Sequence, residues 1–334
     1  MITKSKLFST ILLLFTLMTL ISSCQMSSEP LSRTGFYFDT IIEITIYDTN
    51  DMTILDECMN ICDKYEKMLS SHVSDSDISI INKSKGNPVT VSDNTIELLN
   101  IALQYATLSN GAFDPTIGSV SSLWNFETED HIIPDPVAIS NALSHVNYNN
   151  ILINDSQVTL KDTETKIELG AIAKGYIADM LKEYLISQNI KSGIINLGGN
   201  VLLIGSRPDG SNFNVGIQKP FGANQEVSAT ISAADKSIVS SGVYERYFEK
   251  DGKLYHHILD TSTGYPVDNG IYGITIISDS SVIGDALSTT CFILGLDKGM
   301  DLVEKTEGIE AMFITSDQEI HTSSGFDSYM LNRN

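Results

Sequence analysis

The stretch GITIISDSSVIGDALSTTCFILGL, residues 273–296, passes from one apolar run through a polar turn into another. The run GITIIS is rich in β-branched residues, which favours a buried strand, and we expect a helix after Gly284. In that helix Asp285 and Thr289 stand four residues apart, so their side chains lie on one face, one turn from each other. Two oxygen-bearing side chains therefore meet where a strand passes into a helix.

Two interpretations of this pair remain open from these residues alone. Asp285 and Thr289 together offer the oxygen ligands that a hard cation such as Mg²⁺ accepts. Alternatively, Asp285 only complements the helix dipole near the N-terminus, and Thr289 hydrogen-bonds to the preceding turn. The capping interpretation needs no ligand. The metal interpretation therefore requires support from other motifs of the chain.

The N-terminus has the layout of a secretory signal. Lys4 and Lys6 precede an apolar core that is too short to span a bilayer comfortably, and small residues follow before Cys24. The run ISSC resembles the lipobox of bacterial lipoproteins, in which the cysteine becomes the lipidated first residue. We expect a signal peptide over residues 1–23, a linker over 24–32 and one domain over 33–334, held by lipid on the extracytoplasmic side of the cell membrane. An uncleaved anchor would give the same topology.

Composition narrows the possible ligands. The formal net charge is −21, which argues against a nucleic-acid partner, because phosphates require a basic face. An anionic ligand would need a local cation. Beyond Cys24 the cysteines are Cys58, Cys62 and Cys291, an odd number that we interpret as buried core rather than disulfides or a zinc site.

The order of elements predicts an α+β fold. Alternation predicts a strand over residues 36–48, and apolar spacing predicts a helix over 55–69. A second helix is expected from the Ser92 or Asp93 cap to near Gly111, followed by a long turn-rich stretch that carries the only tryptophan, Trp124. After residue 150, short strands alternate with helices at about 171–188, after Gly284 and near 297–306. No P-loop or dinucleotide-binding glycine pattern occurs, so a nucleotide-binding α/β fold has no support.

Two glycine-containing stretches are typical of ligand sites. In ELGAIAKGYIAD, residues 168–179, an apparent strand runs through Gly170 into a helix with Lys174 in its first turns. Free amides, the helix dipole and an ammonium group would there face one anion, although a plain turn with a solvated lysine is the alternative. In NLGGN, Gly198 and Gly199 indicate either a bulge or the close approach of a ligand.

A third stretch, SSGVYERYFEKDGKLYHHILDTSTGYPV, contains a candidate base. His257 lies three residues before Asp260, and a carboxylate can hold the tautomer of a histidine that takes a proton from a hydroxyl. Because side chains alternate along a strand, His256 and His257 face opposite ways, and the sequence does not choose between them.

Taken together with AFDPTIGSVSSLWNF, these stretches resemble the ApbE-type FAD:protein FMN transferases, which attach FMN to a threonine of a partner protein. The resemblance covers about Phe38 to Leu296, and its motifs follow the family order: AFDPT, LGAIAKGY, NLGGN, SSGxYERYF, HxxDxxTGYP and the Asp-x-x-x-Thr of GDALSTT. It implies an α+β, T-fold-like arrangement of mixed sheets packed with helices, with FAD in a cleft between two halves.

The resemblance also implies a set of site residues. Mg²⁺ would lie on the side chains of Asp285 and Thr289 and the backbone carbonyl of Ala171, and His257 with Asp260 would be catalytic. The positions implied to contact FAD are Phe38, His72, Trp124, Asn125, Phe126, Glu168, Lys174 and the backbone near Leu259. Two of these depart from the family pattern, because Phe38-Asp39-Thr40 replaces Met-Gly-Thr and His72 replaces a common tyrosine. Thr261 also replaces the usual proline after Asp260.

The function expected from the resemblance is Mg²⁺-dependent transfer of FMN from FAD to a threonine hydroxyl of an exported or membrane flavoprotein, with release of AMP. The acceptor would belong to a membrane redox complex or be an extracellular electron-transfer protein. Hydrolysis of FAD to FMN and AMP is one alternative, since water then replaces the threonine. A non-catalytic lipoprotein that binds flavin or another solute is the other.

The lipobox predicts the outcome of one substitution. In Cys24→Ser no thiol remains to be acylated, so the precursor should keep its signal segment and take up no lipid label. The measurement is metabolic labelling with a fatty acid followed by mass analysis of the N-terminus. Unchanged lipid labelling of the variant would exclude Cys24 as the anchor.

Overall fold

The computed structural model describes residues 29–124, 126, 131–223 and 226–333. Cys24, the expected signal segment and Asn125 lie outside the described residues. The largest element is an eight-stranded sheet in which every pairing is antiparallel. Its strands in spatial order are β1 (Leu31–Tyr37), β2 (Thr40–Ile46), β6 (Ser192–Leu197), β7 (Asn200–Gly205), β10 (Ser237–Gly242), β13 (Ile271–Ser278), β14 (Glu310–Thr315) and β15 (Ile320–Thr322).

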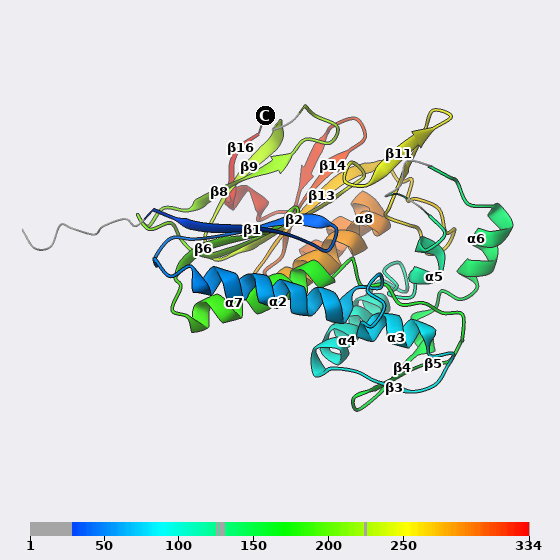
Figure 1. Cartoon of the computed structure of the whole chain (residues 1–334). Helices are drawn as coiled ribbons and strands as arrows, with labels where there is room; N and C mark the ends of the chain where they lie inside the picture. The colour runs from blue at the N-terminus through cyan, green and yellow to red at the C-terminus, as the bar shows by residue number, and fades with distance from the viewer. Residues whose placement is uncertain (1–28, 125, 127–130, 224–225, 334) are drawn as a thin grey trace, which may run out of the picture.

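The two faces of this sheet are covered differently (Figure 1). Helices α2 (Thr53–Leu69), α7 (Ala173–Ser187) and α8 (Ser281–Glu304) lie on one face. A three-stranded sheet of β16 (Met330–Arg333), β9 (Val227–Ala233) and β8 (Phe213–Gln218) packs on the other. In β2 the side chains of Ile42, Ile44 and Ile46 are fully buried, as the period of two in a strand with one core face requires.

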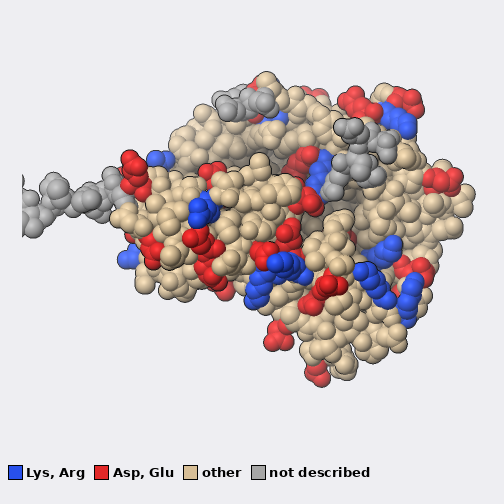
Figure 2. All heavy atoms as spheres, in the orientation of Figure 1, with Lys and Arg blue, Asp and Glu red and all other residues tan. Residues whose placement is uncertain are grey.

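Smaller elements extend one end of this three-layer body (Figure 1). They are α3 (Asp77–Lys83), β3 (Val89–Thr90), α4 (Asp93–Leu108), α5 (Gly118–Ser121), α6 (Pro136–Leu143), β4 (Ile151–Asn154) and β5 (Gln157–Leu160). A separate hairpin consists of β11 (Tyr247–Lys250) and β12 (Lys253–His256). Acidic side chains are spread over the visible face, with basic ones between them (Figure 2).

Helices α7 and α8 cap each other. Asp179 of α7 accepts hydrogen bonds from the backbone N–H groups of Ser281 (2.8 Å) and Val282 (3.0 Å), the first two residues of α8. Asp285 of α8 in turn accepts the N–H of Gly175 in the first turn of α7, at 2.5 Å. Amides in the first turn of a helix have no acceptor within it, and the two carboxylates provide acceptors from the other helix.

Gly175 permits this close crossing. A Cβ atom at residue 175 would lie 2.3 Å from the carbonyl oxygen of Ser281 and 2.7 Å from the Cα of Val282. Both are backbone atoms that cannot rotate away, so any larger residue would push the two helices apart. The glycine of LGAIAKGY is therefore a packing requirement of the α7–α8 junction.

The predicted α+β class is confirmed, and several element boundaries differ from the sequence expectation. The helix expected over residues 55–69 is α2, and the helix expected from Ser92 or Asp93 is α4, with Ser92 as its cap. The segment 36–48 is not one strand, because it contains the end of β1, a turn at Phe38-Asp39 and β2. The pairing of β1 with β2 includes Leu31, five residues before the expected start of the strand. Helix α3 was not foreseen.

The last long helix also differs from the expectation. Helix α8 begins at Ser281, so Asp285 lies beyond its first turn rather than at its start. The backbone leaves the helical region at Gly295 (φ 79°), which accounts for the two separate helices expected there. Cys58, Cys62 and Cys291 are free and buried, as expected. Within the described ranges, no helix has the length and apolarity needed to cross a membrane.

The α7–α8 crossing predicts the effect of Gly175→Ala. Alanine is the better helix former, but its methyl group would clash with the backbone of α8, and such overpacking costs about 1–3 kcal/mol. The measurement is urea-induced unfolding of the variant and wild type. Glu183→Ala, at an exposed position of α7, is the control and should change stability by less than about 0.5 kcal/mol. A Gly175→Ala protein as stable as wild type would contradict the packing account.

Candidate active site

Asp285 lies at the centre of the polar groups between α7 and α8. Its side chain is 5% exposed, and Gly175 N–H is its closest donor at 2.5 Å. Burial raises the pKa of the Asp285 carboxyl to about 6, while Lys174 and the Gly175 amide oppose that rise. Asn200 also lowers this pKa, although its amide nitrogen makes no hydrogen bond of ordinary geometry with any described residue. The carboxylate thus stands among buried polar groups that are only partly satisfied.

Thr289 and Ala171 each contribute an oxygen without a protein partner. Thr289 is half-buried one turn after Asp285, and no described residue hydrogen-bonds to its hydroxyl. In a regular helix the Gly175 amide would donate to the carbonyl of Ala171, but here it donates to Asp285. No other amide of the described chain donates to the Ala171 carbonyl.

This donor set fits a hard cation. It offers one carboxylate, one hydroxyl and one carbonyl, the oxygen ligands that suit Mg²⁺ with water and substrate oxygens in the remaining positions. The described residues contain no cluster of three or more His, Cys, Asp or Glu side chains that would hold a metal. The one carboxylate of the donor set leaves other positions around a cation open for substrate oxygens.

Lys174 supplies positive charge beside Asp285. It is the second residue of α7, and its ammonium lowers the pKa values of Asp285, Glu245 and His257, so it stands near all three. Glu245 is exposed, yet protein surrounds its carboxyl closely enough that desolvation raises its pKa, against the effects of Lys174 and Arg246. The N-terminus of α7 with Lys174 is therefore a local cationic site in an acidic protein.

The structure distinguishes the two adjacent histidines. His256 is 3% exposed, and its Nε2 hydrogen-bonds to the Val267 carbonyl at 2.9 Å. His257 faces the other way, toward Arg246 and Lys174, and burial followed by the charge of Arg246 lowers the pKa of its ring to about 3. His256 is therefore a structural residue, and His257 is the one near the cationic site.

The tautomer of His257 follows from its hydrogen bond. Its Nδ1 lies 3.3 Å from the carbonyl oxygen of Arg246, which can only accept, so Nδ1 carries the proton. With a pKa near 3 the ring is neutral at pH 7, and Nε2 then has a free lone pair. His257 is thus neutral with Nε2 as its acceptor atom, while its low pKa makes the ring a weak base.

Asp260 does not orient His257. Its carboxylate accepts hydrogen bonds from the backbone N–H (2.7 Å) and hydroxyl (2.6 Å) of Ser262, so it caps the turn that follows. The carbonyl of Arg246 takes the orienting role that the sequence reasoning gave to Asp260. Leu259 is buried, and its backbone forms a bridge to Pro266 that closes the same turn.

Glu168 is held by the end of α2. Its Oε2 accepts the Ser71 hydroxyl at 2.5 Å, and its Oε1 accepts the Gly170 amide at 2.9 Å. The carboxylate therefore fixes the tight turn that leads to Ala171 and Lys174. His72, the next residue after Ser71, is exposed.

Trp124 and Phe126 belong to an aromatic cluster. Their rings are stacked with centroids 5.5 Å apart, and Trp124 also contacts Tyr255 and Tyr265. Trp124 is 6% exposed, and its indole N–H donates to the Gly264 carbonyl at 3.0 Å. Trp124 is thus a buried member of this cluster, while Phe126 is half-buried.

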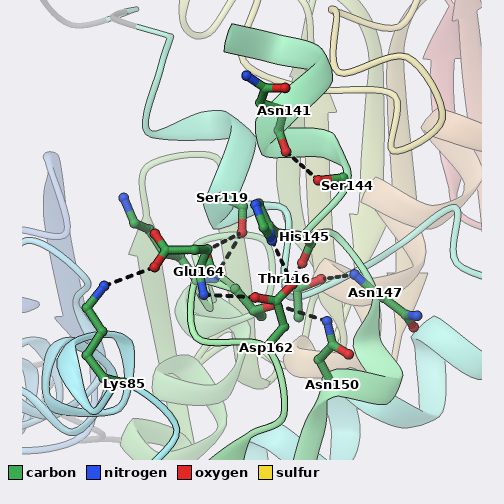
Figure 3. Close-up of polar contacts among 12 residues, drawn as sticks. Lys85, Thr116, Ser119, Asn141, Ser144, His145, Asn147, Asn150, Asp162 and Glu164 are labelled. Carbon is green, nitrogen blue, oxygen red and sulfur yellow. Dashed lines mark hydrogen bonds and ion pairs between the residues drawn. The ribbon is translucent and has the colours of Figure 1, made fainter.

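The role of the AFDPT motif was not foreseen. Asp114 accepts the Thr116 hydroxyl at 2.6 Å and the Tyr148 amide at 2.9 Å, and the Thr116 oxygen accepts the Asn147 amide at 2.8 Å. Figure 3 shows Thr116, Asn147 and the adjacent ion pair of His145 with Asp162. These contacts fix the segments that lead to Trp124 and Glu168. The signal was present in the sequence, since Asp-x-Thr is typical of a turn that bonds its own backbone.

The chain is similar to known proteins over most of its length. Residues 38–313 match the model of the ApbE family. A protein of Treponema pallidum named FAD:protein FMN transferase is 32% identical over 314 residues, covering 88% of this chain and 87% of the relative. A protein of the same name from Klebsiella pneumoniae is 35% identical over 279 residues, covering 83% and 86%.

Solved structures show the same fold. The crystal structure of the ApbE protein from Thermotoga maritima matches with a TM-score of 0.84 and 31% identity, covering 91% of this chain and 100% of that chain. Flavin transferase ApbE from Vibrio cholerae matches with a TM-score of 0.81 and 26% identity, covering 90% and 99%. The family match over most of the chain and the similarity of both sequence and fold lead to one conclusion: this chain belongs to the ApbE family.

Proposed function

We propose that this protein transfers FMN from FAD to a threonine hydroxyl of an acceptor protein and releases AMP. The proposal rests on one observation, which is that Asp285 and Lys174 lie together at the first turn of α7. A cationic helix N-terminus beside a carboxylate and two free oxygens suits a pyrophosphate with its metal ion. The family relatives named FAD:protein FMN transferase support the same substrate.

Each of these residues would have a separate role in binding FAD and the metal ion. The ammonium and backbone amide of Lys174 bind the pyrophosphate. Asp285, Thr289 and the Ala171 carbonyl hold Mg²⁺, which neutralises phosphate charge when bound. Phe126 and Phe38 offer aromatic surface for the flavin ring. With both oxygens of Glu168 engaged by protein donors, its part is to hold the Gly170 turn.

His257 is the proposed base. Its Nε2 takes the proton of the threonine hydroxyl as that oxygen forms a bond to the FMN-side phosphorus. The bond from this phosphorus to the bridging oxygen breaks, and AMP leaves with the electron pair. A neutral ring with Nδ1–H bound to a carbonyl suits this step, because Nε2 is then the only acceptor on the ring.

The location of the reaction is also part of the proposal. The lipobox at Cys24 supports a lipid anchor on the extracytoplasmic side of the membrane. The acceptor would then be an exported or membrane flavoprotein, such as a subunit of a membrane redox complex or an extracellular electron-transfer protein.

A covalent-flavin assay tests the proposed activity. The domain from residue 25 onward is incubated with FAD, Mg²⁺ and a candidate acceptor domain, and the acceptor is examined for bound flavin by in-gel fluorescence and intact mass. We expect the mass of FMN on one threonine and equimolar AMP. Free FMN with AMP and no acceptor adduct would indicate hydrolysis, and FAD binding without AMP would indicate a non-catalytic binding protein.

Substitutions of the two metal-binding side chains should differ in severity. Asp285→Asn removes a full charge from the cation's ligands, whereas Thr289→Val removes one neutral oxygen at nearly constant volume. We expect Asp285→Asn to slow AMP release by about a thousandfold, and Thr289→Val by less, because metal charge neutralisation is a large catalytic contribution. Higher Mg²⁺ should rescue Thr289→Val in part and Asp285→Asn poorly.

A Mg²⁺ titration of AMP release for wild type and both variants gives the measurement. Urea unfolding of the apo proteins is the control, because Asp285 also caps α7 and its loss costs about 1 kcal/mol through that role alone. Three titration curves with the same midpoint and plateau would show that these residues do not hold the metal.

A further inference from the structure

The turn between β1 and β2 has an unusual backbone. Its two central residues, Phe38 and Asp39, have φ values of 53° and 57°. Two-residue hairpins require such angles, which glycine, asparagine or aspartate normally adopts. Asp39 is therefore usual there, whereas the bulky side chain of Phe38 is strained. A strained aromatic residue persists only where its surroundings hold it, and such positions are concentrated at functional sites.

The surroundings that hold Phe38 are the end of α2. The backbone N–H of Phe38 donates to Oε1 of Glu66 at 2.7 Å, across 28 residues of sequence. Glu66 lies in the last turn of α2, where the helix dipole disfavours a carboxylate. Helix stability therefore does not explain a glutamate at this position, whereas the contact to Phe38 does.

The turn held by Glu66 borders the candidate active site. A Cβ atom at Gly198 would lie 2.1 Å from the hydroxyl oxygen of Thr40, so the β6–β7 turn packs directly against the β1–β2 turn. Two residues further, Asn200 bonds to Ser281 and lies beside Asp285. Five residues after Glu66, Ser71 holds Glu168. The end of α2 thus fixes two segments on the edge of the site.

We propose that Glu66 is a positioning residue for the FAD substrate. By accepting the Phe38 amide, its carboxylate fixes the strained turn so that the half-buried Phe38 ring presents a face to the planar flavin ring. Glu66 itself touches no substrate and acts only through Phe38. The inference rests on the proposed function, because it takes FAD to be the substrate.

The test is a double-mutant cycle on FAD affinity. The variants are Glu66→Ala, Phe38→Ala and the double variant, with Glu66→Gln as the conservative replacement that keeps an acceptor oxygen. Asp63→Ala, one turn earlier on α2 and paired with Lys67, is the matched control. The dissociation constant of FAD is measured by fluorescence anisotropy with EDTA present to prevent turnover, and KM and kcat are measured from AMP release.

We expect Glu66→Ala and Phe38→Ala each to weaken FAD binding about five- to tenfold, since aromatic contacts and hydrogen bonds to charged groups are of that size. The double variant should lose no more FAD affinity than the single variant with the larger loss, because both substitutions act through one contact. Glu66→Gln and Asp63→Ala should stay within about twofold of wild type. The change should appear in KM, with kcat at saturating FAD nearly unchanged.

Three results would overturn the inference. Unchanged FAD affinity in Glu66→Ala or in Phe38→Ala would remove one member of the pair, and fully additive losses would show that they act independently. If Glu66→Gln lost as much FAD affinity as Glu66→Ala, the acceptor oxygen of residue 66 would not be the cause of the loss. If wild type bound no FAD and released no AMP even with Mg²⁺ present, the proposed function itself would fail, and this inference with it.

Discussion

The reciprocal capping of α7 and α8 is the interaction on which the site depends. Asp179 of α7 satisfies the first amides of α8, and Asp285 of α8 satisfies an amide in the first turn of α7. Gly175 brings the helices close enough for both contacts. Because the Gly175 amide bonds to Asp285, the carbonyl of Ala171 has no amide donor among the described residues. One packing constraint therefore brings the carboxylate, the free carbonyl and Lys174 to the same place.

This arrangement explains how an acidic chain can hold an anionic substrate. With a net charge of −21, the protein as a whole repels phosphate groups. Lys174 and Arg246 oppose that field locally, since the charges of both lower the pKa values of Glu245 and His257. His257 remains neutral in the same field, because nearby positive charge and burial both oppose its protonation. Binding and proton transfer in the proposed reaction would then depend on the same cations.

The sequence predicted those parts of the structure that local signals determine. Helices α2 and α4 follow from apolar spacing, and the Ser92 cap and Gly111 with φ 83° bound α4 as expected. The alternation of His256 and His257 was predicted, but the choice between them required the fold, since their partners Val267 and Arg246 lie on different segments.

What the sequence could not supply are contacts between distant residues. The bond between Gly175 and Asp285 spans 110 residues, and that between Phe38 and Glu66 spans 28. The first makes Asp285 a cap for α7 rather than for its own helix, and the second holds a turn in which Phe38 has a positive φ that bulky residues usually avoid. The assignment of Asp260 as partner of His257 came from proximity in sequence, whereas the carboxylate caps its own turn.

The central claim is that Asp285, Thr289 and the Ala171 carbonyl hold a divalent cation beside the α7 N-terminus. The most direct measurement is anomalous diffraction from crystals grown with FAD and Mn²⁺, a close substitute for Mg²⁺ that scatters anomalously. The account predicts one anomalous peak within ligand distance of these three oxygens and of a phosphate oxygen of FAD. A bound FAD with no peak there, or with the peak at other residues, would contradict it.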